Sequence, residues 1–137
     1  MSLAILPSPI PVEELMANPW FTLGAVAGAV GVGLGAFGAH GLKSRVGTDL
    51  LAIFETGVRY HLIHALGLLA VGWAAGRWPG SWVQAAGILM VCGILLFSGS
   101  LYLMTLTGAR WLGAITPLGG LAFLAAWALL AVSAFRS

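Results

Sequence analysis

Charged side chains are scarce in this sequence. Asp, Glu, Lys and Arg make up 7% of its 137 residues, against about 25% in an average soluble domain. A soluble fold of this length could not hide so much apolar surface, because surface grows almost as fast as volume in small domains. The composition therefore excludes an ordinary soluble domain and favours a chain that lipid solvates.

Cysteine is almost absent as well. Cys92 is the sole cysteine, so the chain can form no internal disulfide and no thiolate cluster for a metal. We expect Cys92 to behave as a small buried hydrophobe. The formal charge of +2, without a basic patch interleaved with aromatic residues, argues against a nucleic-acid partner. The length supports one domain.

Long apolar runs are what the sequence does contain. Each is close to the ~20 residues that cross a bilayer as helix, and none alternates in polarity as a barrel strand does. The predicted fold is an all-α membrane protein with four transmembrane helices in one bundle, residues 19–137. A proline-containing tail, residues 1–18, precedes it, and for that tail we expect partial disorder. The expected spans are Trp20–Leu42, Val58–Ala75, Trp82–Leu106 and Trp111–Phe135.

The segment between the first two spans has helical spacing. Val46, Leu50, Ile53 and Phe54 recur at intervals that place them on one helix face. The segment is either a short amphipathic helix in the plane of the interface or an extension of the second span. The predicted architecture adopts the short separate helix.

Four spans place both termini on one membrane face, which we name side A, with the opposite face named side B. Acidic residues precede the first span and no basic residue does, which favours a retained helix over a cleaved signal peptide. Side B carries more Lys and Arg, so the positive-inside rule predicts a cytoplasmic side B and termini outside. The basic residues are Arg77 and Arg136 on side A, and Lys43, Arg45, Arg59 and Arg110 on side B.

The first span is rich in glycine. Residues 33–38 match the dinucleotide-binding fingerprint formally, but that motif needs a preceding strand in a soluble βαβ unit. Small residues four apart instead predict close helix packing, first at Gly24 and Gly28 and then at Ala27, Gly31, Gly35 and Ala39. Packing within the bundle is favoured over a homo-oligomer contact, and both remain open.

Polar side chains gather in the side B half of the predicted bundle. They predict a polar pocket that could bind a ligand, because ionisable residues inside a membrane are costly and often functional. Glu55 and Arg59 have the spacing of a helical ion pair, and Pro117 is expected to kink the fourth span. The candidate pocket residues are His40, Glu55, Arg59, His61, His64, Ser98, Tyr102 and Thr116.

The histidines allow three interpretations. His61 and His64 could ligate a metal or haem, but two ligands are too few for a zinc site, for which His40 would be the third. A proton relay is a second interpretation, because imidazole titrates near neutrality. The third is structural, with the histidines bonded to neighbouring helices. Whether a metal binds is left open by the sequence.

Four segments of the chain are distinctive in sequence: Gly35–Lys43, Thr56–Gly67, Phe97–Tyr102 and Gly113–Gly120. They resemble the domain-of-unknown-function family 423, which is related to transmembrane protein 256 of eukaryotes. The resemblance covers about residues 21–135 and implies a small bacterial inner-membrane protein with several spans and no established activity. It supplies no catalytic residues to carry over, and it does not extend to the tail.

The leading functional hypothesis is a non-enzymatic binding or accessory component of the membrane that needs no cofactor. Its partners would be the lipid bilayer and a small ligand, a lipid headgroup or a membrane protein, with Arg59 able to pair with an anion. One alternative is a proton-coupled transporter or channel for a small solute. The other is a redox protein that binds haem, metal or quinone through His40, His61 and His64.

Overall fold

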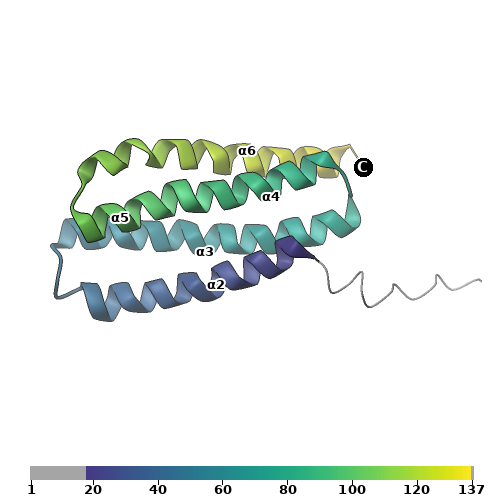
Figure 1. The fold of residues 1–137 in the computed structure, drawn as a ribbon. Helices are drawn as coiled ribbons and strands as arrows, with labels where there is room; N and C mark the ends of the chain where they lie inside the picture. The colour runs from purple at the N-terminus through teal and green to yellow at the C-terminus, as the bar shows by residue number, and fades with distance from the viewer. Residues whose placement is uncertain (1–17, 137) are drawn as a thin grey trace, which may run out of the picture.

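The computed structural model describes residues 18–136. Four long helical segments run side by side in alternating directions (Figure 1). The first and third segments each include a π-helical stretch, and a 3₁₀ turn precedes the last helix. The segments are α2 (Pro19–Phe37) with π-helix η1 (Gly38–Leu42); α3 (Thr48–Arg77); α4 (Ser81–Gly93) with π-helix η2 (Ile94–Ser98) and α5 (Gly99–Thr107); and 3₁₀ helix η3 (Arg110–Ala114) with α6 (Thr116–Phe135).

Three of these segments are long and apolar enough to cross a membrane: Pro19–Leu42, Ser81–Thr107 and Arg110–Phe135. The prediction of an all-helical chain with helices long and apolar enough to cross a membrane is therefore confirmed. The α3 segment does not reach the same hydropathy, and it carries Glu55, Arg59 and two histidines within its length. Its crossing of the bilayer stays a prediction.

The separate short helix predicted between the first two spans is wrong, because α3 runs unbroken from Thr48 to Arg77. No glycine or proline interrupts residues 48–56, so no residue there favours a break. Phe54 is 1% exposed and packs with Leu42 and Val58. The apolar face of residues 48–56 thus forms the first turns of a long helix, and Val46 packs beside it.

Glycines let α2 approach α3 closely. A Cβ on Gly24 would lie 2.9 Å from the carbonyl oxygen of Ala65, and one on Gly31 would lie 2.6 Å from Leu62 Cδ2. Gly38 continues this line against Phe54, at 3.1 Å. A Cβ on Gly28 would meet nothing within 4 Å, so the predicted Gly24/Gly28 pair is wrong in its second member. The three glycines in tightest contact with α3, Gly24, Gly31 and Gly38, are spaced seven residues apart.

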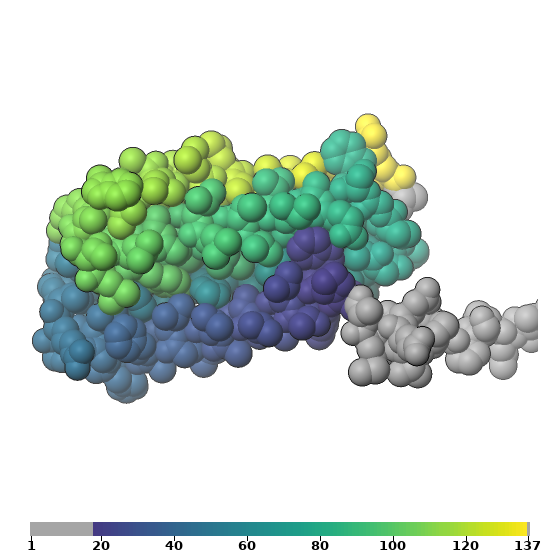
Figure 2. All heavy atoms as spheres, viewed as in Figure 1, coloured from purple at the N-terminus to yellow at the C-terminus, as the bar shows by residue number. Residues whose placement is uncertain are grey.

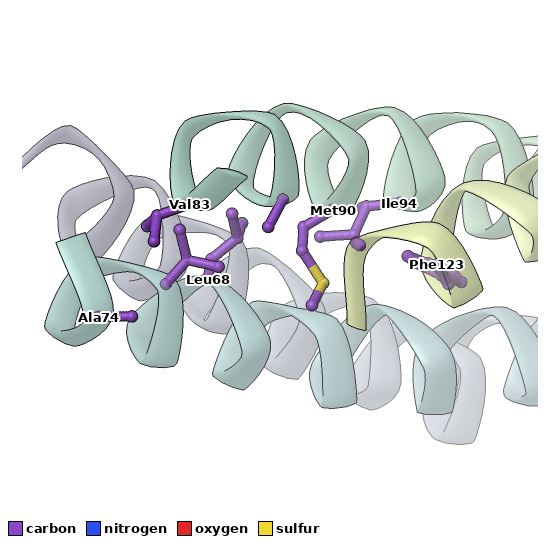
Figure 3. Packing of buried hydrophobic residues seen from close by; sticks show 9 residues of the cluster. Leu68, Ala74, Val83, Met90, Ile94 and Phe123 are labelled. Carbon is purple, nitrogen blue, oxygen red and sulfur yellow. The ribbon is translucent and has the colours of Figure 1, made fainter. Parts of the chain in front are cut away.

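The main core lies where α3, α4 and α6 meet (Figure 3). Two further glycines make it compact, because Gly93 faces the ring of Phe123 and Gly119 faces the backbone of Phe97 without room for a Cβ. α6 therefore packs tightly on α4 and η2. The buried members of this core are Leu68, Val71, Ala74, Val83, Ala86, Met90, Ile94, Phe123 and Ala126.

Pro117 does not kink the last helix, contrary to the prediction. Helix α6 begins at Thr116, which places Pro117 in its first turn. Proline is tolerated there because the first helical N–H groups have no intrahelical acceptor. The predicted span from Trp111 is therefore divided, with η3 forming its first turn and α6 the remainder.

Asn18 ties the start of α2 to α3. Its side-chain oxygen accepts a hydrogen bond from Phe21 N at 3.2 Å, which caps the helix. Its amide nitrogen donates to the carbonyl oxygen of Gly72 at 2.6 Å. Helix α2 thus starts one residue before the predicted span from Trp20, whereas the rest of the predicted tail lies outside the described residues.

Candidate functional site

The predicted pocket residues do not form one site. His61, Tyr102 and Ser98 join in a buried network between α3 and the η2–α5 segment. His64 meets a different neighbouring helix and packs against α6. Thr116 bonds to Ser100 where α5 and α6 meet. His40, Glu55 and Arg59 are all exposed.

The His61 network links α3 to η2 and α5. His61 Nδ1 lies 3.0 Å from the hydroxyl of Tyr102, which also interacts with Ser98. The Ser98 hydroxyl donates to the carbonyl oxygen of Gly57 at 2.7 Å. Gly57 admits the Tyr102 ring, since a Cβ there would lie 2.9 Å from Tyr102 Cε1. The network therefore depends on close approach of α3 and α5.

The second ring nitrogen of His61, Nε2, makes no hydrogen bond. Nε2 is buried, and His61 as a whole is 5% exposed. The backbone carbonyl of Ala27 interacts with the ring without reaching hydrogen-bond geometry. Buried polar atoms are usually bonded, and one that is not calls for an explanation such as a missing ligand.

Both ring nitrogens of His64, in contrast, are hydrogen-bonded. Its Nδ1 lies 2.7 Å from the carbonyl oxygen of Tyr60, so Nδ1 carries the hydrogen and donates it. Nε2 accepts from the indole N–H of Trp127 at 3.1 Å. The ring stacks on Phe123 with centroids 3.3 Å apart and planes 8° apart. Both nitrogens are used, which fixes a neutral tautomer and a structural role.

Trp127 was missed by sequence reasoning. The other tryptophans in the described chain, such as Trp20, Trp78 and Trp111, lie near helix ends, where amphipathic rings favour the membrane interface. Trp127 instead lies in the middle of α6, eleven residues after Thr116. A tryptophan at that depth needs an acceptor for its N–H, and that requirement was the available signal.

The predicted ion pair between Glu55 and Arg59 does not form; both side chains are exposed. Within residues 18–136 the ion pair is instead between Asp49 and Arg110, with 2.7 Å between Arg110 Nη2 and Asp49 Oδ2. It joins the start of α3 to η3 at the surface. The hydrogen bond from Arg110 lowers the pKa of Asp49 from its usual value of 3.8.

Hydroxyl groups fasten α5 to its neighbours. Ser100 and Thr116 share a hydrogen bond of 2.7 Å between α5 and α6. Thr105 donates to the carbonyl oxygens of Leu101 at 3.0 Å and Leu50 at 3.1 Å. These hydroxyls, like that of Ser98, are committed to contacts within the protein and are not arranged around a shared cavity.

The described residues offer no group of three or more His, Cys, Asp or Glu side chains that could hold a metal ion. His40 lies on the exposed side of η1, so it does not join His61 and His64. A metal site built from His40, His61 and His64 therefore has no geometric support in residues 18–136.

Two of the grooves between the helices have a histidine in their lining. One, of about 200 Å³, lies between α2 and the α4–η2 segment over α3, and His61 forms part of its wall. The space-filling view shows α2 below, α4 above and atoms of α3 between them (Figure 2). The other, of about 730 Å³, lies between α3 and α6 and includes Tyr60, His64 and Trp127.

A family model described as "Protein of unknown function (DUF423)" matches residues 34–120. The chain belongs to the DUF423 family. The matched range contains every predicted pocket residue, from His40 to Thr116, and both histidines of α3. The resemblance inferred from the sequence is thereby confirmed.

Curated relatives of this DUF423 chain are membrane proteins by name. The UPF0382 membrane protein YwdK of Bacillus subtilis is 50% identical over 115 residues, covering 83% of this chain and 94% of the relative. A UPF0382 membrane protein of Staphylococcus haemolyticus is 45% identical over 114 residues, covering 83% and 93%. The UPF0382 inner membrane protein YgdD of Escherichia coli is 39% identical over 112 residues, covering 82% and 86%. No solved structure matches the chain.

Proposed function

We propose that this DUF423 chain is a four-span inner-membrane protein that binds a membrane-borne ligand without transforming it. The observation that carries the proposal is the unpaired Nε2 of His61 in the wall of an apolar groove. A polar atom buried without a partner costs free energy unless something satisfies it. Less than 1 Å² of Nε2 is exposed, so a ligand that enters the groove from the bilayer and displaces the side chains over Nε2 would supply that partner.

The four-span topology rests on the position of α3. Its 30 residues correspond to about 45 Å of helix, enough to cross a bilayer. α3 contacts α2 on one side and the α4–α5 segment and α6 on others, so its polar side chains have protein neighbours in place of lipid. Residues 58–75 are the crossing part, which leaves Asp49 outside the membrane.

Cysteine labelling tests this topology. In a Cys92→Ala background, a cysteine at Ser44 lies between α2 and α3, and one at Ser81 lies at the start of α4. If α3 crosses, an impermeant thiol reagent labels the two positions from opposite membrane faces. Labelling of Ser44→Cys from the cytoplasmic face supports termini outside. Labelling of both positions from one face would refute the fourth span.

Binding is favoured over catalysis because the polar groups near His61 are already occupied. Ser98 donates to Gly57, and Tyr102 is held by His61 and Ser98. A proton path through both histidines is not favoured, because both nitrogens of His64 are bonded. The groove side of His61 is the part of this cluster that can accept another molecule.

Native mass spectrometry of the gently extracted protein tests ligand binding, with two variants that separate the two nitrogens of His61. His61→Asn keeps an amide where Nδ1 faces Tyr102, but it has no atom at the Nε2 position. Tyr102→Phe removes the Nδ1 partner and leaves Nε2 in place. Circular dichroism and thermal unfolding verify that each variant folds.

We expect a reproducible extra mass on the wild-type protein that His61→Asn loses and Tyr102→Phe retains. A bare wild-type chain at a single stoichiometry would overturn the binding proposal. It would leave the polar cluster as a set of helix–helix hydrogen bonds and direct the search to protein partners.

A further inference from the structure

The composition of the His61 groove limits the chemistry of its occupant. His61 is the sole polar side chain that lines it, and no charged side chain does. The apolar walls come from α2, from Leu68 of α3 and from the α4–η2 segment. These apolar lining residues are Leu23, Val26, Ala27, Val30, Leu68, Val91, Ile94 and Leu95.

We propose that the occupant is an uncharged lipid with one hydroxyl group, whose hydroxyl bonds to His61 Nε2 while its hydrocarbon chain lies along α2. This inference rests on the proposed binding function and specifies the ligand class. His61 lies beside Gly31, since a Cβ on Gly31 would be 3.3 Å from His61 Cδ2. From there the wall formed by α2 extends back toward Leu23, which gives the hydrocarbon chain its direction.

The composition of the groove argues against a phospholipid headgroup. In the proposed topology residues 58–75 cross the bilayer, so His61 lies three residues, or about 4–5 Å, inside the hydrocarbon core. A charged headgroup is costly there, and no side chain that lines the groove is a cation that could pair with a phosphate. An uncharged lipid can place a single polar group at this depth.

A hydroxyl is the group that suits Nε2 in either tautomer of His61. If Nδ1 donates its hydrogen to Tyr102, Nε2 is an acceptor and needs a donor. If Tyr102 donates to Nδ1, Nε2 carries the hydrogen and needs an acceptor. A hydroxyl both donates and accepts, whereas a carbonyl or ether only accepts.

The experiment measures binding of four matched probes to the purified protein in nanodiscs, by native mass spectrometry and by ¹⁵N NMR of labelled histidine. The probes are oleyl alcohol, its methyl ether, the corresponding alkene and oleate. We expect the alcohol to bind about three- to tenfold more tightly than the alkene, the range for one hydrogen bond. It should also shift the Nε2 resonance of His61 and leave that of His64 unchanged.

Variants supply the matched control. His61→Asn should bind the alcohol and the alkene equally, because the apolar walls remain and the Nε2 atom is gone. Tyr102→Phe should keep the preference for the alcohol. The methyl ether identifies the tautomer, because it binds as tightly as the alcohol when Nε2 carries the hydrogen and only as tightly as the alkene when it does not.

Two results would overturn the inference. Equal binding of alcohol and alkene to the wild-type protein would show that His61 selects no hydroxyl, and tighter binding of oleate would show a charged-ligand site. Either result, together with a His61-dependent mass on the extracted protein, would leave the binding function standing with another ligand. In a further experiment, the binding of dioleoylglycerol is compared with that of farnesol, which distinguishes a glycerolipid from an isoprenoid alcohol.

Discussion

The indole N–H of Trp127 donates to His64 Nε2 over 3.1 Å, between residues 63 positions apart in the chain. The same imidazole uses Nδ1 to donate to the carbonyl oxygen of Tyr60. Protonation of His64 would set an N–H of the ring against the N–H of Trp127. The contact thus joins α6 to α3 and holds the imidazole neutral.

Replacing Trp127 by Phe should destabilise the protein by about 1 kcal/mol or somewhat more, because it leaves His64 Nε2 buried without a donor. Unfolding in a detergent–SDS titration measures the effect. Trp111→Phe is the control, since the Trp111 side chain is 69% exposed and the substitution should change stability little. Equal effects of the two substitutions would show that the Trp127 hydrogen bond contributes nothing.

Alanine substitutions in α2 should separate its contacting glycines from its open ones. Gly24→Ala should destabilise the α2–α3 contact, because the new Cβ would meet backbone atoms of Ala65 and Leu69 at 2.9 Å. Gly28→Ala meets nothing within 4 Å and should be neutral or stabilising by up to about 1 kcal/mol, the helix propensity difference. SDS-induced unfolding tests both variants. A large loss in Gly28→Ala, together with a change of oligomeric state, would instead reveal a contact between copies.

Ser98→Ala should cost about 0.5–1.5 kcal/mol, because a hydrogen bond between helices is lost at a fully buried position. The Ser98 hydroxyl bonds to Gly57 O on α3, and its side chain is 0% exposed. Thr107→Ala is matched to it, since the Thr107 hydroxyl bonds to Leu103 O within its own helix and is exposed. Comparison of their unfolding midpoints decides the point, and similar midpoints for the two variants would contradict it.

The Asp49–Arg110 pair should make a small pH-dependent contribution to stability. Its hydrogen bond lowers the pKa of Asp49 below 3.8 in the folded protein. The pair therefore stabilises the fold above about pH 4 and loses that effect as the pH falls through the lowered pKa. In an NMR titration of the Asp49 carboxyl group, Arg110→Gln should move the midpoint up toward 3.8. An unchanged midpoint would show that the pair does not persist in solution.

The two histidines of α3 show where sequence reasoning stopped. His61 and His64 are three residues apart, so a helix places them about 60° from each other, and the sequence assigned them to one broad face. The structure separates them, because His61 meets α2 and Tyr102 while His64 meets Trp127 and Phe123. An angle of 60° suffices to place two side chains against different neighbouring helices.

Local signals explain the other outcomes. The apolar runs predicted the extents of α2, the α4–α5 segment and α6 closely, because lipid solvation requires long uninterrupted apolar helices. The Pro117 kink failed because proline at a first helical turn looks the same in sequence as proline within a helix. The Glu55–Arg59 pair failed because helical spacing permits an ion pair that exposed side chains need not form.

The sequence by itself determined that this DUF423 chain is a helical membrane protein with long apolar segments. Composition and run length are local properties, and they decide how each segment meets lipid. The tertiary structure alone decided that His64 is fully bonded and that His61 Nε2 is not. Tyr102, the partner of His61 Nδ1, lies 41 positions away, and Trp127, the partner of His64 Nε2, lies 63 positions away. Only the packing of α3 against its neighbours selects these partners.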